Sequence, residues 1–471
     1  MKKLITKNIH YPIINLISNY SNEENVEIYL VGGFVRDLIL ERQSKDIDVL
    51  VIGNGIDFAL GFAKKVNGKI HVFKKYGTAM LNTKGCDIEF VGSRKESYSS
   101  YSRNPAIEIG TLQDDLSRRD FTINTLAISL NKKNFGKVID LFDGITDLKR
   151  KIIKTPLDPQ VTFHDDPLRM FRAARFASQL DFKIDKQNID FIKKEKDRIE
   201  IISKERINIE LNKILMSKNP SIGFKALNDA GLLRIILPEI CDLSGVDEIE
   251  GKTHKDNFHH TLKVVDNICR TTDKLWLRWV ALLHDIGKPR TKKFDKKIGW
   301  TFHGHEYVGS KMVDKIFRRL KLPLNDKLIY VKKLVSLSSR PIVLSLENIT
   351  DSAVRRLIYD AGDYIDDLLI LCEADITTKN EFLQKKYLNN FKIVREKIKI
   401  VEERDQIRNF QPPVTGDEIM NYFNLKPCKE IGIIKDFIKE SILNGDIANS
   451  YDDAKKLMIK KGKKLGLSTN E

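Results

Sequence analysis

Two aspartates separated by one residue have a spacing that could bind a metal ion. Asp46 and Asp48 stand at the start of an apolar run that ends at Ile52. If this run is a β-strand, alternate residues point to the same face, so both carboxylates project together. Adjacent carboxylates repel each other unless a cation lies between them, and hard oxygen ligands favour Mg²⁺. The alternative is that both acids form the solvated face of an edge strand.

A glycine pair precedes these aspartates and could approach a phosphate group. Gly32 and Gly33 follow the apolar, strand-like run 28–31. Because they lack Cβ atoms, the backbone can turn sharply there and come close to a ligand. Arg36 and Asp37 follow within a short segment of helical periodicity. Backbone N–H groups near the glycines could hold triphosphate oxygens while the carboxylates hold metal ions.

A third carboxylate could come from the strand predicted at residues 87–91. Asp87 and Glu89 share one face of that strand. An ordinary edge strand is the alternative. The next residues, 93–106, combine small hydroxyl side chains, two tyrosines and one proline, which predicts a flexible loop. Such a loop could close over a nucleotide or serve as a connector only.

Two arginines and an aspartate, Arg118 to Asp120, directly precede an apolar run that we expect to be helical. Asp120 could cap that helix, and the arginines could bind phosphate or sugar. Asn124 lies four residues further on. For two arginines in isolation, a solvated basic corner is the alternative.

A helix predicted at residues 163–177 carries charged side chains at a regular interval. They are Asp165, Asp166, Arg169, Arg172 and Arg175. A surface ion pair would explain one Asp and Arg three residues apart, but not three arginines at a constant interval. A carboxylate accepts a hydrogen bond from an exocyclic amino group, and an arginine donates to a ring nitrogen or carbonyl oxygen. Together they could recognise both cytosine and adenine without a template.

A second group of possible metal ligands lies in the histidine-rich segment 254–305 and beyond it. Its members are His260, His284, Asp285, His303, His305 and Asp375. Imidazole and carboxylate ligands suit transition metals, and such a site can activate water against a phosphate ester. A single histidine is more often a core or surface residue, but this ordered set predicts a metal site.

Composition limits the class of protein. The chain has 471 residues, which predicts two to four domains, and its 41% hydrophobic and 31% charged residues indicate a globular protein. The net charge of +16 favours a polyanionic partner, with a membrane surface or a lysine-rich coding bias as alternatives. We expect no membrane span, because no apolar run is long enough. Five scattered cysteines fit a reducing cytoplasm and argue against zinc–thiolate binding.

The ordered motifs between residues 25 and 240 resemble those of polymerase β-like nucleotidyltransferases. The closer resemblance is to class II CCA-adding tRNA nucleotidyltransferases and bacterial poly(A) polymerases. The segment 204–211 matches a further helix of that family. At Asp165 the family usually has Glu, so the shorter side chain gives this position less reach.

The resemblance implies catalytic, Mg²⁺-binding roles for Asp46, Asp48 and Glu89. It implies base reading by Asp166 and Arg169 and a phosphate contact at Arg172. The nucleotide-binding set as a whole is Gly32, Gly33, Arg36, Asp37, Arg118, Asp120, Asn124, Asp166, Arg169, Arg172 and Arg175.

The histidine-rich segment resembles the HD phosphohydrolase domain. His260, His284, Asp285 and Asp375 fall on its defining positions, with His303 and His305 as candidate extra ligands. The resemblance implies an unspecified divalent transition metal at this site.

We therefore expect an α/β catalytic head with a small mixed sheet at residues 1–150, followed by helical domains. These are a neck at 151–245 that includes the base-reading helix, an HD domain at 246–385 and an RNA-binding tail at 386–471. The expected activity is template-independent addition of CCA to tRNA from CTP and ATP, in the cytoplasm, by two-metal nucleotidyl transfer. Alternatives are a poly(A) polymerase, an enzyme that adds only CC or only A, an HD phosphohydrolase, and a non-catalytic RNA-binding protein. The oligomeric state stays open.

Overall fold

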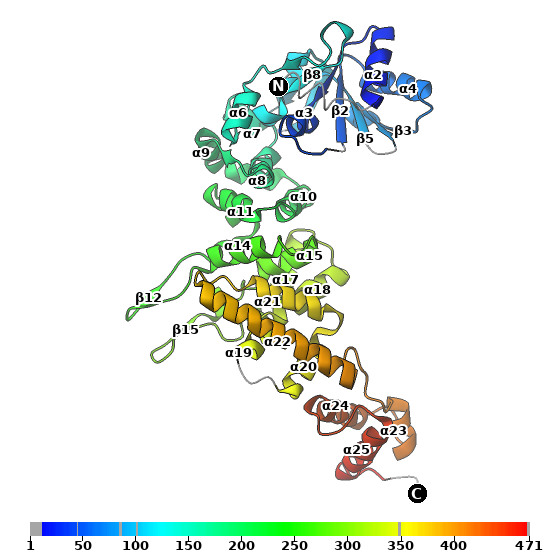
Figure 1. Ribbon diagram of the computed structural model, residues 1–471, viewed down its shortest axis with the longest axis vertical. Coiled ribbons are helices and arrows are strands. Elements are labelled where there is room, and N and C mark those ends of the chain that lie inside the picture. Colours follow the sequence, from blue (N-terminus) through cyan, green and yellow to red (C-terminus); the bar gives the residue numbers. More distant parts are fainter. Residues whose placement is uncertain (1–11, 45, 84–86, 100–101, 347–349, 469–471) are drawn as a thin grey trace. The chain divides into compact units, whose positions relative to one another are not determined.

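The computed structural model of the chain describes residues 12–44, 46–83, 87–99, 102–346 and 350–468 (Figure 1). The chain forms two compact units, Met1–Ile214 with Ile222–Ile235, and Leu215–Ser221 with Ile236–Glu471. The finer division into four domains stays a prediction.

A seven-stranded mixed sheet forms the core of the first unit. The strand order is β3 (Ile70–Phe73), β4 (Thr78–Asn82), β5 (Asp87–Gly92), β2 (Asp46–Val51), β1 (Ile28–Val31), β8 (Ala127–Ser129) and β9 (Val138–Ile139). The central pair, β2 and β5, is parallel, and the other neighbouring pairs are antiparallel. The predicted small mixed sheet is confirmed.

Apolar packing fixes the sheet between its helices. Every residue of β1 is buried, as expected for a strand between two neighbours. Helix α4 (Gly55–Lys65) contacts β4 and β5, and its Phe58 and Phe62 rings lie 5.7 and 5.8 Å from the Phe90 ring. Helix α2 (Pro12–Glu23) precedes the sheet, and α3 (Gly32–Ile39) follows β1 directly. This packing holds the start of β2 and the start of α3 near each other.

Two local predictions in this unit are wrong. The expected loop 93–106 is a β-hairpin of β6 (Arg94–Ser99) and β7 (Ser102–Ile109), with a register irregularity between Ser97 and Ser99. Pro105 is tolerated there because both strands of a two-stranded ribbon are edge strands.

The second wrong prediction is the helix after Asp120. This run forms the 3₁₀ turn η2 (Thr122–Asn124) and then strand β8. Pairing of β8 with β1 overrides the helical pattern, because it buries Leu126, Ala127 and Ile128 completely.

The predicted helix at 163–177 is interrupted at a proline. Helix α7 (Pro159–Asp165) ends there and α8 (Leu168–Leu180) begins after Pro167. Asp166 has extended backbone angles, as is usual for a residue before proline. The apolar face of α8 is buried as expected, at Met170, Ala173, Ala174 and Ala177. Helix α10 (Lys204–Leu215) follows later in the chain.

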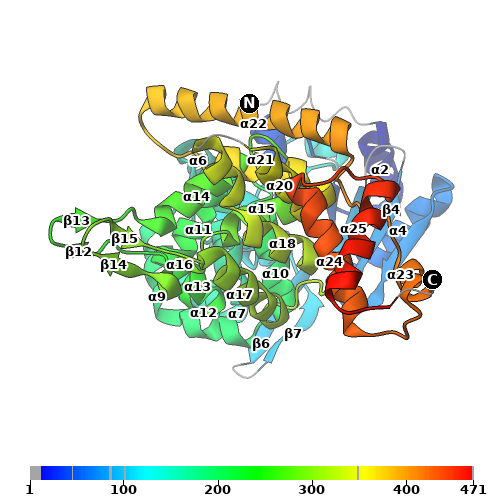
Figure 2. The same ribbon diagram turned by 90° about the horizontal axis from the view of Figure 1, so that it is seen from below.

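The second unit is mostly helical. Helix α14 (Asn257–Ile268) contacts α15 (Leu275–Leu283) and α21 (Ile365–Ala374), and α17 (His305–Arg319) contacts α18 (Asp326–Leu337). Helix α22 (Glu381–Asp405) is followed by α23 (Gly416–Phe423), α24 (Lys429–Asn444) and α25 (Tyr451–Lys464). Helices α24 and α25 pack side by side in Figures 1 and 2. No described helix is long and apolar enough to cross a membrane.

Candidate functional site

The three predicted catalytic carboxylates lie on the two parallel strands at the centre of the sheet. In the β2–β5 register, Asp48 is paired with Glu89 and Asp46 with Asp87. Asp87 accepts a hydrogen bond from Asn82 instead, at 2.7 Å. Among the described residues, no three ligand atoms from Asp46, Asp48 and Glu89 lie within 4.8 Å of one another. The structure therefore places the three side chains on one face, with Asp48 and Glu89 opposite each other.

Asp48 is held in a position where its charge is unfavourable. Burial raises its pKa to about 6, with further repulsion from Glu89 and Asp46, although Arg119 and Arg36 oppose the rise. A carboxylate that is half-buried among other acids favours a bound cation. This electrostatic environment fits a divalent metal ion held by Asp48 with Asp46 and Glu89.

Gly32 is required where it stands. Its φ angle is +73°, in the left-handed region that favours glycine. A Cβ atom there would lie 3.0 Å from Arg119 Nη1 and 3.0 Å from Asp48 Oδ2. At Gly33 a Cβ atom would lie 3.6 Å from Arg36 Nη2, an ordinary contact. The first glycine therefore leaves space between the Asp48 carboxylate and the Arg119 guanidinium group.

A chain of hydrogen bonds connects the motif at Asp120 to α3 and α8. Arg36 donates to the Asn124 side chain at 2.8 Å, Asn124 donates to Asp120 at 2.9 Å, and Arg172 donates to Asp120 at 2.7 Å. Burial opposes ionisation of Asp120, but Arg172 and Asn124 lower its pKa to about 2. Asp37 forms an ion pair with Arg36 at 2.8 Å. Asp120 and Asn124 thus position two arginines by direct contact.

The two predicted base-reading residues lie at the start of α8, Asp166 just before the helix and Arg169 in its first turn. Asp166 Oδ1 accepts a hydrogen bond from Leu168 N at 3.1 Å, and Arg206 Nη2 lies 3.3 Å from Asp166 Oδ2. Arg169 donates to the carbonyl oxygens of Thr162 and Arg118, at 3.3 and 2.6 Å. Both side chains are therefore oriented by neighbouring groups of the chain.

Arg175 differs from the other two arginines of the series because it is anchored inward. It is buried, pairs with Glu210 at 3.1 Å, and its guanidinium lies 4.2 Å from the Phe176 ring centre. Burial and the charge of Arg172 lower its pKa to about 10. The contacts of Arg175 are therefore mainly structural: its guanidinium packs on Phe176 and pairs with Glu210.

One cavity of about 570 Å³ brings most of the predicted residues together. Its lining includes Gly32, Gly33, Arg36, Asp48, Arg118, Asp120, Asn124, Asp166, Arg169, Arg172 and Arg175. The predicted nucleotide-binding set did not include Arg119, Arg206 or Lys213, which also line the cavity. The sequence could have indicated two of them. Arg119 belongs to the arginine pair next to Asp120, and Arg206 belongs to the segment 204–211 that resembles a helix of the family.

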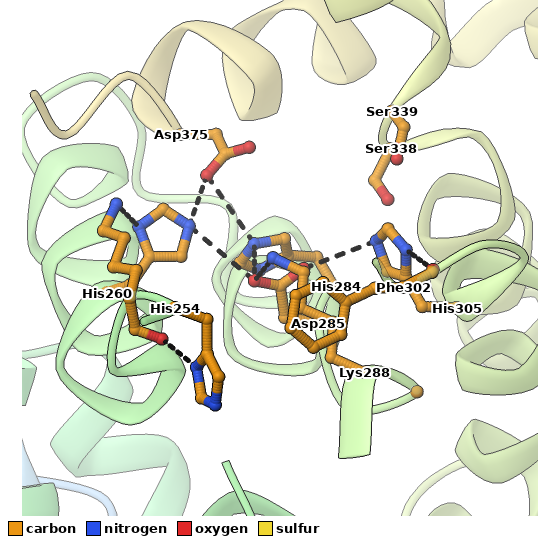
Figure 3. Close-up of polar contacts among 12 residues, drawn as sticks. His254, His260, His284, Asp285, Lys288, Phe302, His305, Ser338, Ser339 and Asp375 are labelled. Atoms are coloured by element: carbon orange, nitrogen blue, oxygen red, sulfur yellow. Dashed lines mark hydrogen bonds and ion pairs between the residues drawn. The ribbon is translucent and has the colours of Figure 1, made fainter. Parts of the chain in front are cut away.

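The predicted histidine and aspartate ligands come together in the second unit (Figure 3). His260 Nε2 lies 2.7 Å from Asp375 Oδ1, and His284 Nε2 lies 3.3 Å from Asp285 Oδ2. One ligand atom from each of His260, His284 and Asp285 can be chosen so that all three lie within 4.8 Å of one another. We call His260, His284, Asp285 and Asp375 the HD cluster.

The donor atoms of the HD cluster fit a metal ion. His284 Nε2 and Asp375 Oδ1 are buried, and neither has a hydrogen-bond partner of acceptable geometry among the described residues. The other ring nitrogen of His284 lies 2.8 Å from the Ala281 carbonyl oxygen, which leaves Nε2 free to bind metal. Burial also lowers the pKa of His260, which favours the neutral imidazole that binds metals.

The structure separates the two candidate extra ligands. His305 Nε2 lies 3.6 Å from Asp285 Oδ1, and its Nδ1 lies 2.9 Å from the Phe302 carbonyl oxygen. The His303 side chain is exposed. Lys288, which the sequence analysis did not assign, lies 2.7 Å from Asp285 Oδ2. The sequence did carry a signal for Lys288, because it follows Asp285 by three residues, a spacing at which two side chains can meet on one face of a helical turn.

Comparison with known proteins matches three regions of the chain. The model described as "Poly A polymerase head domain" matches residues 28–154, "Probable RNA and SrmB- binding site of polymerase A" matches 181–243, and "HD domain" matches 257–380.

Curated relatives include A-adding tRNA nucleotidyltransferases and a multifunctional CCA protein. The chain is 30% identical over 350 residues to the A-adding tRNA nucleotidyltransferase of Deinococcus radiodurans, which covers 72% of this chain and 77% of that protein. It is 30% identical over 383 residues to the Multifunctional CCA protein of Shewanella frigidimarina, covering 77% and 86%. The A-adding enzyme of Aquifex aeolicus is 42% identical over 165 residues, but this match spans only 20% of that protein.

Solved structures of CCA-adding enzymes have the same fold as this chain. A CCA-adding enzyme in its apo form II has a TM-score of 0.66 at 24% identity, with 97% of this chain and 98% of that chain covered. The Thermotoga maritima CCA-adding enzyme complexed with tRNA has a TM-score of 0.60 at 23% identity, with 97% and 98% covered. These likenesses confirm the predicted fold class.

Proposed function

Because the chain belongs to the tRNA nucleotidyltransferase family of CCA-adding and A-adding enzymes, we propose that it adds CCA to the 3′ end of tRNA. The substrates are tRNA, CTP and ATP, and the product released at each step is pyrophosphate. Family membership implies dependence on divalent metal ions. Mg²⁺ is the ion that we assign to the head.

One observation carries this proposal. A single cavity is lined by Asp48 and Gly32 and also by Asp166 and Arg169. A triphosphate near Asp48 and a base near Asp166 can therefore belong to one nucleotide. The size of the cavity, about 570 Å³, suits a ligand of that class.

The side chains divide the work of the reaction. The 3′-hydroxyl of tRNA attacks the α-phosphate, and pyrophosphate leaves. Bound Mg²⁺ supplies activation of the hydroxyl and stabilises the leaving oxygens. Asp46, Asp48 and Glu89 hold the ions, while Arg118 and Arg119 face the polyphosphate. Asp166 and Arg169 hold the base by its Watson–Crick edge.

An assay with labelled nucleotides and tRNA that lacks its 3′ CCA tests the proposal. The folded protein should incorporate CTP and ATP with Mg²⁺. On tRNA that lacks its 3′ CCA, incorporation of CTP separates the alternatives, because an A-only enzyme would add nothing there and would extend only a tRNA that already ends in CC. A poly(A) polymerase would instead add many A residues in the absence of CTP.

A second function is favoured by the two unsatisfied atoms of the HD cluster. We propose that His260, His284, Asp285 and Asp375, with His305, hold a divalent transition metal and hydrolyse a phosphate ester. Asp46→Ala and Asp285→Ala should each remove one activity and leave the other.

The net charge of +16 supports an RNA-binding role for the lysine-rich tail, in which α25 ends with Lys460, Lys461, Lys463 and Lys464. We also propose a cytoplasmic location, supported by the scattered cysteines.

A further inference from the structure

We propose that Asp115 is a positioning residue that fixes Arg118 and Arg119 toward the triphosphate of the incoming nucleotide. It lies on α5 (Leu112–Ser117), and it does not line the cavity. The inference rests on the proposed nucleotidyl transfer and adds a residue to its machinery.

The Asp115 carboxylate is fully used by two neighbouring arginines. Oδ1 accepts from Nε and Nη2 of Arg118, and Oδ2 accepts from Nε and Nη2 of Arg119 at 3.2 and 2.9 Å. A carboxylate offers about four lone-pair sites, so these four bonds fill it. Side chains of consecutive residues normally diverge, and this carboxylate is what brings both guanidinium groups together.

Burial makes this arrangement rigid. The Asp115 side chain is 0% exposed, whereas those of Arg118 and Arg119 are 20% and 17% exposed. Burial alone would raise the pKa of Asp115, but Arg119 and Arg118 lower it below its ordinary value. The acid therefore stays ionised behind the arginines, and charge-assisted bonds of this kind are short and directional.

The position of Arg119 also affects Asp48, the carboxylate proposed to bind the metal ion. Arg119 Nη1 and Asp48 Oδ2 both lie at 3.0 Å from the position of a Cβ atom on Gly32. Without Asp115, Arg119 would be free to pair with Asp48, where it would compete with the metal ion. Asp115 therefore keeps Arg119 available for phosphate oxygens and Asp48 available for the metal.

Asp115→Asn removes one acceptor oxygen and turns an amide N–H₂ toward a guanidinium group. We expect it to weaken binding of CTP by about tenfold or more, but binding of CMP by less than about twofold, because CMP lacks the β- and γ-phosphates. Calorimetry on the full chain with Mg²⁺ measures both affinities. The Mg²⁺ concentration for half-maximal CTP binding should rise as well.

Asp147→Asn is the matched control. Asp147 is also a buried carboxylate of the first unit, and it accepts a hydrogen bond from Thr122 at 2.7 Å, away from the two arginines. It should leave the ratio of CTP to CMP affinity unchanged. If Asp115→Asn fails to fold, Arg119→Gln provides the second measurement, with the same selective loss of CTP affinity.

Where both variants fold, the double variant Asp115→Asn with Arg119→Gln should lose little more CTP affinity than Asp115→Asn alone, because the loss of the Asp115 charge already releases Arg119. Equal losses for CTP and CMP, no loss for CTP, or additive losses in the double variant would each overturn the role of Asp115. A wild-type protein that binds CTP but transfers nothing to tRNA would instead contradict the proposed function alone.

Discussion

Arg169 donates a hydrogen bond from Nη2 to the main-chain carbonyl oxygen of Arg118, over 2.6 Å. This bond connects α8, to which we assign base reading, to the pair Arg118 and Arg119, to which we assign the polyphosphate. A second bond, from Arg172 to Asp120, joins the same two segments. If the proposed roles hold, the choice of base and the binding of triphosphate depend on a shared set of contacts.

Replacing Asp48 by Asn should abolish nucleotide addition and stabilise the metal-free protein. The folded-state pKa of about 6 exceeds the unfolded value of about 4, so ionisation costs stability as pH rises from about 4 through 6. At pH 7 in EDTA, Asp48→Asn should gain about 3 kcal/mol, at about 1.4 kcal/mol per pKa unit. Hydrogen exchange of peptides that cover β2 measures this gain.

The gain should disappear at pH 4, where Asp48 is protonated in the folded wild-type protein. Asp46→Asn is the control, because Asp46 is exposed. It should lose activity without a comparable gain in protection. Equal protection from hydrogen exchange in wild type and Asp48→Asn at pH 7 would show that the Asp48 charge does not destabilise the metal-free protein.

Replacing Asp166 by Asn should change which bases are accepted. The amide oxygen can still accept from Leu168 N, so the start of α8 is kept. The amide N–H₂ would donate to the carbonyl groups of uracil and guanine, where the carboxylate accepted from amino groups. The ratio of kcat/KM for CTP to that for UTP should fall about tenfold or more.

Asp165→Asn is the matched control for this change, since its side chain is the neighbouring acid with less expected reach. It should leave the CTP to UTP ratio within about twofold of wild type. An unchanged CTP to UTP ratio in Asp166→Asn would show that other residues of the cavity recognise the base.

Replacing Gly32 by Ala should impair both stability and triphosphate binding. The positive φ angle makes a non-glycine residue unfavourable by about 1–2 kcal/mol, and the new Cβ atom would press on Arg119 and Asp48. Gly53→Ala has a φ of +122° and nothing within 4 Å of its Cβ atom. Gly53→Ala should therefore lose stability but keep its KM for CTP. An unchanged KM for CTP in Gly32→Ala would argue against close approach of the phosphates to Gly32.

Replacing His284 by Ala should remove metal from the second unit. His284 supplies a buried nitrogen with no hydrogen-bond partner of acceptable geometry among the described residues, whereas His303 is exposed. Calorimetric titration with Mn²⁺ should show loss of a tight site in His284→Ala and none in His303→Ala. Nucleotide addition should continue in both variants, because the head carboxylates are untouched. Equal Mn²⁺ binding by wild type and His284→Ala would remove the HD cluster from consideration as a metal site.

The strands that carry the three proposed catalytic carboxylates could be predicted because their apolar runs are short and bounded by turn residues. The strand β8 could not, since its residues follow a helical pattern until they pair with β1, which is distant in sequence. The same limit explains Asp115 and Arg119. Their type and spacing are visible in the sequence, but only the fold shows that Arg119 lies beside Asp48.

The histidine set shows where spacing stops being informative. Sequence spacing does not distinguish His303 from His305, yet in the structure His303 is exposed, whereas His305 Nε2 lies 3.6 Å from Asp285 Oδ1. The unsatisfied state of His284 Nε2 is a property of packing and has no signal in the sequence.

Incubation of the full chain with labelled nucleotides and a tRNA that lacks its 3′ CCA tests the central claim most directly. With Mg²⁺, CTP and ATP, the product should grow by three nucleotides, C, C and A, and growth should stop there. With ATP alone it should not grow on this tRNA. No incorporation by a folded sample, or growth only on tRNA that already ends in CC, would contradict the claim.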